Sequence, residues 1–371
     1  ALETARAQQA LGLPVRFVSA NPRETRHREA WLQLLARERG LAEVEIPGLR
    51  LPKHIGPLRS FLDVRSLGGF LREGEVDLIH CHLPGDHYVA RLAIRRSGRS
   101  IPLVRTVYEG ETPPPTPRRR AAFAHADRIV CHSEAVARQL RERASDYDLD
   151  PARVLYLPPP IDTVRFDPAR ALGSRREQLG VPADGICFGI VARMQTHRRF
   201  EILLEAFQQA RARDPRLHLV IVGRGTNQEE VARGPVRERG LEDSIHFAGY
   251  VSGEDYVATL ASCDAKVFMV PGSDGTCRAV REALALGLPA IVTARGILPE
   301  LVRHELDGLV VAGEVEDLRD ALLRMAEDGP AREAMGRAAR LGAEERFAYP
   351  RLAERLRAIY RELQTSSRAE G

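Results

Sequence analysis

Residues 266–289 read KVFMVPGSDGTCRAVREALALGLP, and this stretch decides the fold. The opening residues Lys266–Val270 form an almost continuous apolar run, which is typical of a strand covered on both faces of a sheet. A turn containing glycine follows, and a helix is predicted over Arg278–Leu286. The stretch therefore predicts a strand, a turn and a helix in succession, the repeating unit of a parallel α/β sheet.

The same alternation of short apolar runs and amphipathic stretches recurs along the chain. Strands are predicted at Val15–Ala20, Val76–His82, Pro102–Glu109, Asp127–Ser133, Arg153–Pro159, Ile186–Arg193, Leu217–Gly223, Ile245–Tyr250, Lys266–Val270, Ala290–Thr293 and Gly308–Val311. Helices are predicted at Glu29–Arg39, Tyr88–Arg96, Glu201–Arg213, Glu254–Ala261, Arg278–Leu286 and Leu318–Glu327. Two such series predict two doubly wound, Rossmann-like domains with parallel sheets.

A proline-rich segment separates the two series. Residues 157–168 read LPPPIDTVRFDP, which has too much proline for the interior of a helix or strand and is typical of a stiff linker. We therefore expect a first domain over residues 1–168 and a second over residues 169–349.

The composition narrows the class of protein. Of 371 residues, 44% are apolar and 29% are charged, and no apolar run approaches the roughly 18 residues of a membrane-spanning helix. Five cysteines without a C-x-x-C pair argue against disulfides or structural zinc and favour the cytoplasm. The net charge is +4, and only Lys53 and Lys266 among 55 basic residues are lysines. Because aromatics are only 5%, nucleic acid is not an expected partner.

The turn after Val270 has groups that suit a phosphate and a polyol. Gly275 lets the backbone approach a ligand, and the N–H groups of Thr276, Cys277 and Arg278 would face a phosphate at a helix N-terminus. Asp274 and Glu282 could hold a polyol from two sides. The alternative interpretation is that Asp274 only caps the helix and Glu282 is a solvated acid.

Two other strand ends carry weaker signals. Arg193, Arg198 and Arg199 follow the strand at 186–193, and arginine can bind a diphosphate through two hydrogen bonds at once. The alternative is a cationic turn on the surface. Gly223 begins a G-x-G after another strand, which alone indicates little.

These segments, in this order, resemble family 4 of the retaining GT-B glycosyltransferases, which use nucleotide-sugar donors. Residues 192–199 resemble the family's G-R-L-x-x-x-K-G, with Arg198 at the usual lysine. Asp274 to Glu282 resembles its E-x7-E, with Asp in place of the first Glu. Further segments that resemble the family's second domain are residues 247–251, 296–302 and 307–310.

The resemblance implies roles for these residues. Arg193 and Arg198 would contact the donor diphosphate, Asp274 the donor sugar and Glu282 the ribose. The predicted catalytic residues are therefore Arg193, Arg198 and Asp274. The predicted donor-binding residues are Gly223, Val251, Gly275, Thr276, Cys277, Arg278 and Glu282.

The first half resembles the family less closely, through residues 76–82 and 126–134. The resemblance places His82, Tyr108 and Glu109 on the acceptor side, with Tyr108 where a histidine is often found. The chain begins in what resembles the family's first helix, so we expect the opening strand and glycine-rich loop to be missing. A C-terminal helix at about residues 350–366 would complete this domain, and the two domains would face a cleft.

The expected function is therefore retaining transfer of a hexose from a nucleotide sugar, UDP- or GDP-linked. The acceptor would be a saccharide or glycolipid in cell-envelope glycan or lipopolysaccharide synthesis. Arginine and a helix N-terminus would neutralise the diphosphate, so we expect no metal and no cofactor. The arginines between Asp86 and Glu109, with Arg118–Arg120, would face anionic lipid or an anionic acceptor, or else be solvated helix faces. Alternatives are a GT-B epimerase or phosphorylase, or a sugar-nucleotide-binding subunit without catalysis.

Overall fold

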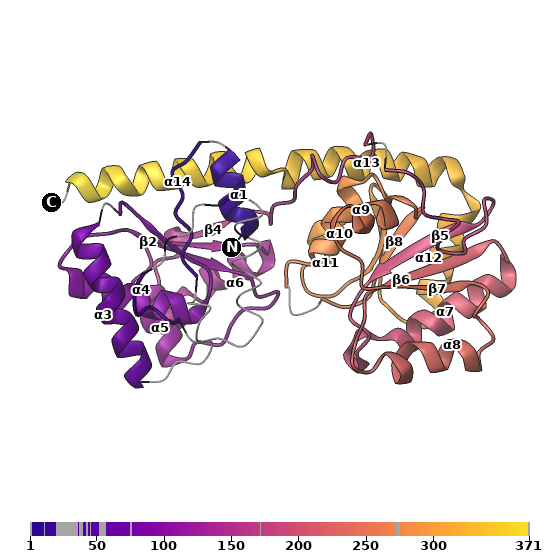
Figure 1. Ribbon diagram of the computed structural model, residues 1–371, viewed down its shortest axis with the longest axis horizontal. Coiled ribbons are helices and arrows are strands. Elements are labelled where there is room, and N and C mark those ends of the chain that lie inside the picture. The colour runs from indigo at the N-terminus through magenta and orange to yellow at the C-terminus, as the bar shows by residue number, and fades with distance from the viewer. Residues whose placement is uncertain are drawn as a thin grey trace. The chain divides into compact units, whose positions relative to one another are not determined.

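The computed structural model describes residues 2–10, 12–19, 36, 40, 41, 44, 46–51, 57–74, 76–170, 172–271 and 275–369, leaving out the side chains of residues 57–59 and 366–369. The chain forms two compact units, one of residues 1–160 with 349–371 and one of residues 161–348 (Figure 1). The division falls before the boundary that the proline-rich segment predicts. Ile161 N donates to Phe347 O at 2.7 Å, and Ile161 and Phe166 are buried in the core of the second unit.

The first unit contains a four-stranded parallel sheet in the order β1-β2-β3-β4. Its strands are β1 (Ile79–Cys81), β2 (Leu103–Val107), β3 (Arg128–Cys131) and β4 (Val154–Tyr156). Its helices are α1 (Leu2–Ala10), α3 (Pro57–Glu73), α4 (Pro84–Ser97), α5 (Pro117–Ala124), α6 (Glu134–Glu142) and α14 (Tyr349–Ala369), with short 3-10 turns at Ala144–Tyr147 and Pro151–Arg153.

The amino-terminal helix α1 lies beside the carboxyl-terminal helix α14 (Figure 1). Ala7 of α1 packs with Leu352, Ala353 and Leu356 of α14 in one buried cluster, which also includes Val104 of β2. The predicted strand at 15–20 does not join the sheet in its described part, residues 15–19. Of the predicted helix at 29–39, only Ala36 lies within the described residues.

The second unit contains a six-stranded parallel sheet in the order β10-β9-β8-β5-β6-β7. Its strands are β5 (Ile186–Val191), β6 (Leu217–Val222), β7 (Ile245–Gly249), β8 (Ala265–Phe268), β9 (Ala290–Thr293) and β10 (Gly308–Val311). Its helices are α7 (Phe200–Arg213), α8 (Gly234–Glu238), α9 (Gly253–Ala261), α10 (Arg278–Ala285), α11 (Leu298–Leu301), α12 (Val315–Glu327) and α13 (Gly329–Phe347), with a 3-10 turn at Thr196–Arg198 and a π-turn at Glu229–Arg233.

Two buried clusters cover the two faces of this second sheet. One unites apolar side chains of α7 and α12 with one face, and the other unites those of α9, α10 and α13 with the opposite face. Strands covered on both sides read as continuous apolar runs, which is why the sequence pattern was informative. The prediction of two doubly wound parallel-sheet domains is confirmed.

No helix within the described ranges is both long enough and apolar enough to cross a membrane.

Candidate functional site

Two arginines mark the carboxyl end of β5. Arg193 is exposed, whereas Arg198 is nine-tenths buried and its Nη1 donates to Val270 O, at the end of β8, at 3.0 Å. The Nε of Arg198 finds no hydrogen-bond partner among the described residues. Burial lowers the pKa of Arg198 and Arg193 lowers it further, while Cys277 opposes the shift. A buried guanidinium with an unused donor is suited to bind an anion.

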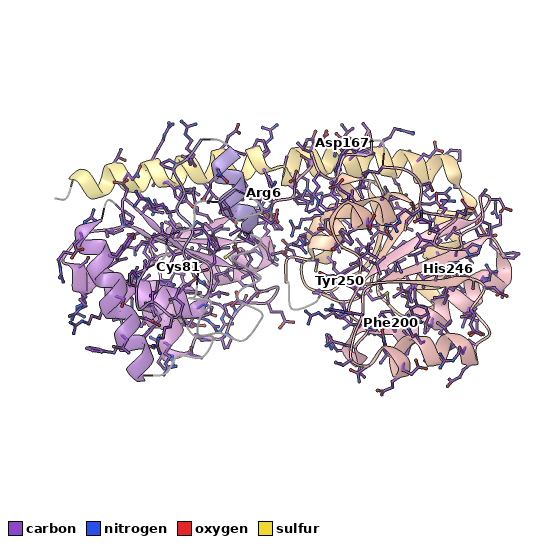
Figure 2. All side chains as sticks on the ribbon, in the orientation of Figure 1. Arg6, Cys81, Asp167, Phe200, His246 and Tyr250 are labelled. Atoms are coloured by element: carbon purple, nitrogen blue, oxygen red, sulfur yellow. The ribbon has the colours of Figure 1, made fainter. Side chains whose placement is uncertain are left out.

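The loops after β5 and β6 touch backbone to backbone. A Cβ on Gly223, whose φ is +136°, would lie 2.2 Å from Ala192 O, and one on Gly225 would lie 2.0 Å from Met194 O. No side chain fits at these positions, so glycine at 223 and 225 is what allows the loop with Arg193 to lie this close to the loop after β6. Tyr250, labelled in Figure 2, follows β7 and is succeeded by half-buried Val251. Arg224, which follows β6, lies over the Tyr250 ring at 5.0 Å from its centroid.

The turn before α10 differs in detail from the prediction. Thr276 lies outside the helix, because α10 begins at Arg278 with Cys277 as its N-cap. Cys277 is buried and has a φ of +47°, a backbone conformation that normally favours glycine. Arg281, also buried, donates from Nη2 to Thr276 Oγ1 at 2.9 Å and so fastens the turn. Asp274 lies outside the described residues, and Gly275 is the first described residue after it.

Glu282 is a buried side chain, not the solvated acid of the alternative interpretation. It lies in α10 with only 5% of its surface exposed. The hydroxyl of Tyr256, from α9, donates to Glu282 Oε2 at 2.5 Å, and Arg278 Nε lies 3.3 Å from Glu282 Oε1. Burial and the nearby carboxylate raise the pKa of Tyr256 well above its usual value, so the phenol keeps its proton and remains a donor. Glu282 is therefore an oriented hydrogen-bond acceptor in α10, the helix that follows β8.

In the first unit, the structure brings together the three predicted acceptor-side residues. His82 Nδ1 and the Tyr108 hydroxyl lie 2.7 Å apart, and Tyr108 N donates to Glu109 Oε2 at 3.0 Å. The ring of His82 stacks on that of His80, with centroids 4.5 Å apart. His132 meets the Tyr108 ring edge-on at 5.0 Å.

The terminal helix contributes to this cluster through Tyr360. The Tyr360 hydroxyl lies 2.5 Å from His80 Nδ1, and Thr106 Oγ1 lies 2.6 Å from His80 Nε2. Burial lowers the pKa of His80 to about 3 and that of His82 well below its usual value. Both rings are therefore neutral at pH 7 and can accept as well as donate hydrogen bonds.

The predicted basic surface of this unit is only partly used in internal contacts, since Arg95, Arg96 and Arg118 are exposed. Arg99 donates to the carbonyls of Leu71, Gly74 and Val76, and Arg105 is buried 3.7 Å from Asp86. In the next helix, the Arg120 guanidinium forms two hydrogen bonds with the Asp148 carboxylate. Arg99 and Arg120 serve the fold, because their side chains form hydrogen bonds with backbone or carboxylate groups of the same unit.

Over the residues with described positions, no three His, Cys, Asp or Glu side chains are grouped to hold a metal ion. Sequence reasoning missed three residues near the predicted site. Tyr256 donates a hydrogen bond to Glu282, Arg281 donates one to Thr276, and Lys266 is buried in β8. Only an apolar strand interrupted by a lysine, at position 266, could have indicated one of them.

Comparisons with known proteins agree with this fold and arrangement. Residues 174–342 match the family described as glycosyl transferases group 1, and residues 1–165 match glycosyltransferase family 4. A D-inositol 3-phosphate glycosyltransferase of Saccharomonospora viridis is 32% identical over 81% of this chain and 73% of its own length. The enzyme of the same name from Actinosynnema mirum is 30% identical over 95% of this chain and 83% of its own.

Similar solved structures share the whole architecture. Anabaena HepE, solved in complex with UDP, has a TM-score of 0.78 at 17% identity, over 97% of this chain and 94% of its own. Sucrose-phosphate synthase from Thermosynechococcus elongatus has a TM-score of 0.74 at 20% identity, over 98% and 92%. Two parallel-sheet domains of this kind define a GT-B glycosyltransferase. Within that class, the chain belongs to glycosyltransferase family 4.

Proposed function

We propose that this protein is a retaining glycosyltransferase whose second unit binds a nucleoside diphosphate sugar. The observation that carries the proposal is a set of three groups in the second unit: exposed Arg193 and buried Arg198 with an unused donor, both after β5, and buried Glu282 on α10. Arginines suit a diphosphate, and an oriented carboxylate suits the two hydroxyls of a ribose. Asp274, Val251 and the 275–278 turn are proposed to complete the donor site.

Uridine is the favoured base, with guanosine as the alternative. Anabaena HepE has been solved with UDP and with UDP-glucose, which supports a uridine donor for a chain of the same fold. In the proposed reaction, Arg193 and Arg198 stabilise the charge that develops on the departing diphosphate. Preorganised donors of this kind contribute several kcal/mol to a transition state.

The proposed chemistry needs no nucleophile from the protein. The acceptor hydroxyl attacks the anomeric carbon from the face that the diphosphate leaves, its proton passes to a leaving phosphate oxygen, and configuration is retained. His82, Tyr108 and Glu109 are proposed to bind the acceptor, because their polar groups form one linked set beside a strand end. The proposal includes no metal and no cofactor, with arginine and the α10 N-terminus neutralising the diphosphate.

The acceptor class has two candidates. The first is a saccharide or glycolipid of the cell envelope, reached from the cytoplasm and with contact to anionic lipid. The second is a phosphorylated cyclitol, which the names of the relatives from Saccharomonospora viridis and Actinosynnema mirum favour. We favour the second, because the relatives' names agree on it and some of the arginines expected to face lipid, such as Arg99 and Arg120, are bound within the first unit.

The test combines binding and product analysis. A thermal-shift panel of UDP, GDP, ADP and dTDP identifies the base, since a ligand at 100 times its Kd adds about 2.7 kcal/mol of stability. The matching UDP-sugar is then incubated with myo-inositol phosphates or with lipid-linked saccharides, and the anomeric configuration of the product is read by NMR. An inverted product would contradict retention, and binding without turnover would favour a binding subunit.

A further inference from the structure

The fully buried lysine of the second unit is an exception in this chain. Only two of the 55 basic residues are lysines, and one of them, Lys266, lies in the middle of β8 with 1% of its surface exposed. Its Nζ has no hydrogen-bond partner among the described side chains and backbone groups. A buried ammonium without a partner costs several kcal/mol, so this position needs an explanation.

The direction of the Lys266 side chain follows from the strand. Ala265 and Val267 pack in the cluster of α7 and α12, whereas Phe268 packs in the cluster of α9 and α10. Because side chains alternate along a strand, Lys266 points with Phe268 toward α9 and α10. Those two helices carry Tyr256 and Glu282, the hydrogen-bonded pair described above.

Two groups act electrostatically on the Lys266 amine. They are Glu282 on α10 and Cys263, which directly precedes β8. Burial lowers the pKa of Lys266 to about 7, and these two neighbours oppose that shift. An amine of this kind gains or loses its proton near neutral pH, which a guanidinium cannot do. Lys266 therefore differs from the many arginines of this chain in one property, which is that it can change its protonation state near neutral pH.

We propose that Lys266 is a positioning residue for donor binding, whose buried amine lies on the α10 side of β8 and holds the Glu282 carboxylate in place through its charge, without a hydrogen bond to it. The proposal rests on the proposed function, in which Glu282 binds the ribose. Tyr256 holds Oε2 and Arg278 approaches Oε1 from the surface, and the charge of buried Lys266 acts on the same carboxylate from the side of β8. Protonated Lys266 attracts the Glu282 carboxylate, whose oxygens are the groups that would accept hydrogen bonds from two hydroxyls.

A double-mutant cycle separates this role from simple packing. The Kd of UDP-glucose is measured by calorimetry at pH 7 for the wild type, Lys266→Met, Glu282→Gln and the double variant. We expect Lys266→Met to raise the Kd about five- to tenfold in the wild-type background and less than twofold in the Glu282→Gln background. In turnover, KM for the donor should rise while kcat changes little. Equal effects in both backgrounds would overturn the proposal.

A matched control and a second measurement protect the test from misfolding. Val267→Ala changes the next residue of β8, which is equally buried but faces the other way, and it should leave the Kd unchanged. If Lys266→Met fails to fold, the wild-type Kd for UDP-glucose is followed from about pH 6 to about pH 8.5. The groups around the amine are Cys263, Glu282, Tyr256 and Arg278, and burial lowers the pKa of Lys266 to about 7.

The Kd should rise with pH as Lys266 loses its proton, and a flat profile would contradict the proposal. The outcomes also distinguish a failure of the proposed donor site from a failure of the proposed role of Lys266. If Glu282→Gln leaves the Kd unchanged, or the wild type does not bind UDP-glucose, the proposed donor site is wrong. If only Lys266→Met is without effect, the donor site stands and the positioning role is wrong.

Discussion

Replacing the buried lysine should change how stability depends on pH. Lys266→Met keeps the length of the side chain and removes its only titratable group. In the unfolded chain the amine has a pKa near its ordinary value of 10.5, whereas burial lowers it to about 7 in the folded protein. Between these values the unfolded chain binds a proton that the folded protein does not, so the free energy of unfolding rises with pH.

The magnitude follows from the two pKa values. Each pH unit is worth about 1.4 kcal/mol when one state is fully protonated and the other is not. At pH 7 folded Lys266 is half protonated, so the slope starts at half this value. The wild type should therefore gain about 2 kcal/mol relative to Lys266→Met between pH 7 and pH 9. Below about pH 6 both states are protonated and the difference becomes constant.

The assay is urea unfolding of both proteins at several pH values, with hydrogen exchange of peptides from β8 to α10 to report on the second unit. Groups that titrate in both proteins cancel in the difference between the two curves. Parallel curves from pH 7 to pH 9 would refute the reasoning, because they would mean that Lys266 has the same pKa folded and unfolded. A difference that falls with pH would refute it as well.

Three other variants test separate parts of the site. Gly223→Ala should destabilise the second unit by at least about 2 kcal/mol in urea unfolding, because the added Cβ would meet Ala192 O. The control is Gly240→Ala, which has a φ of +64° but open space around the added Cβ, and it should cost about 1 kcal/mol. Equal costs would contradict the close approach of the two loops. Tyr256→Phe should weaken UDP-glucose binding roughly tenfold by removing the hydrogen bond to Glu282, and unchanged calorimetric affinity would contradict that role. Tyr108→Phe should lower kcat/KM for the acceptor roughly tenfold and leave donor affinity unchanged; a loss of donor affinity instead would contradict its place on the acceptor side.

Much of the fold could be predicted from the sequence because its strands are buried on both faces. β9 and β10 were predicted with their observed bounds, and β5 and β6 end within two residues of prediction. Helices were harder, since α3 and α13 have weak amphipathic patterns and were not predicted. The division after residue 160 falls inside the predicted proline-rich linker, but its position within the linker could not be predicted, because the backbone bond of Ile161 to Phe347 joins residues far apart in sequence.

In the candidate site as well, the sequence predicts some features and not others. The spacing of residues in the two motifs points to Arg198 and Glu282, because each motif begins at the end of a predicted strand. It could not reveal that Glu282 is buried under the Tyr256 hydroxyl, since α9 approaches α10 only in the folded protein. Nor could charge along the chain show that Arg99 and Arg105 are used internally, because their partners come from other elements.

The central claim is that the second unit binds a nucleotide sugar through the arginines at the end of β5. Calorimetric titration of UDP-glucose into the wild type, Arg198→Ala and Arg213→Ala tests it most directly. Arg213 is an exposed arginine at the far end of α7 and serves as the matched control. Arg198→Ala should weaken binding about 10- to 100-fold, since a hydrogen bond to a charged group contributes roughly 1.5–3 kcal/mol, and Arg213→Ala should bind like the wild type. An affinity of Arg198→Ala within twofold of the wild type would contradict the account.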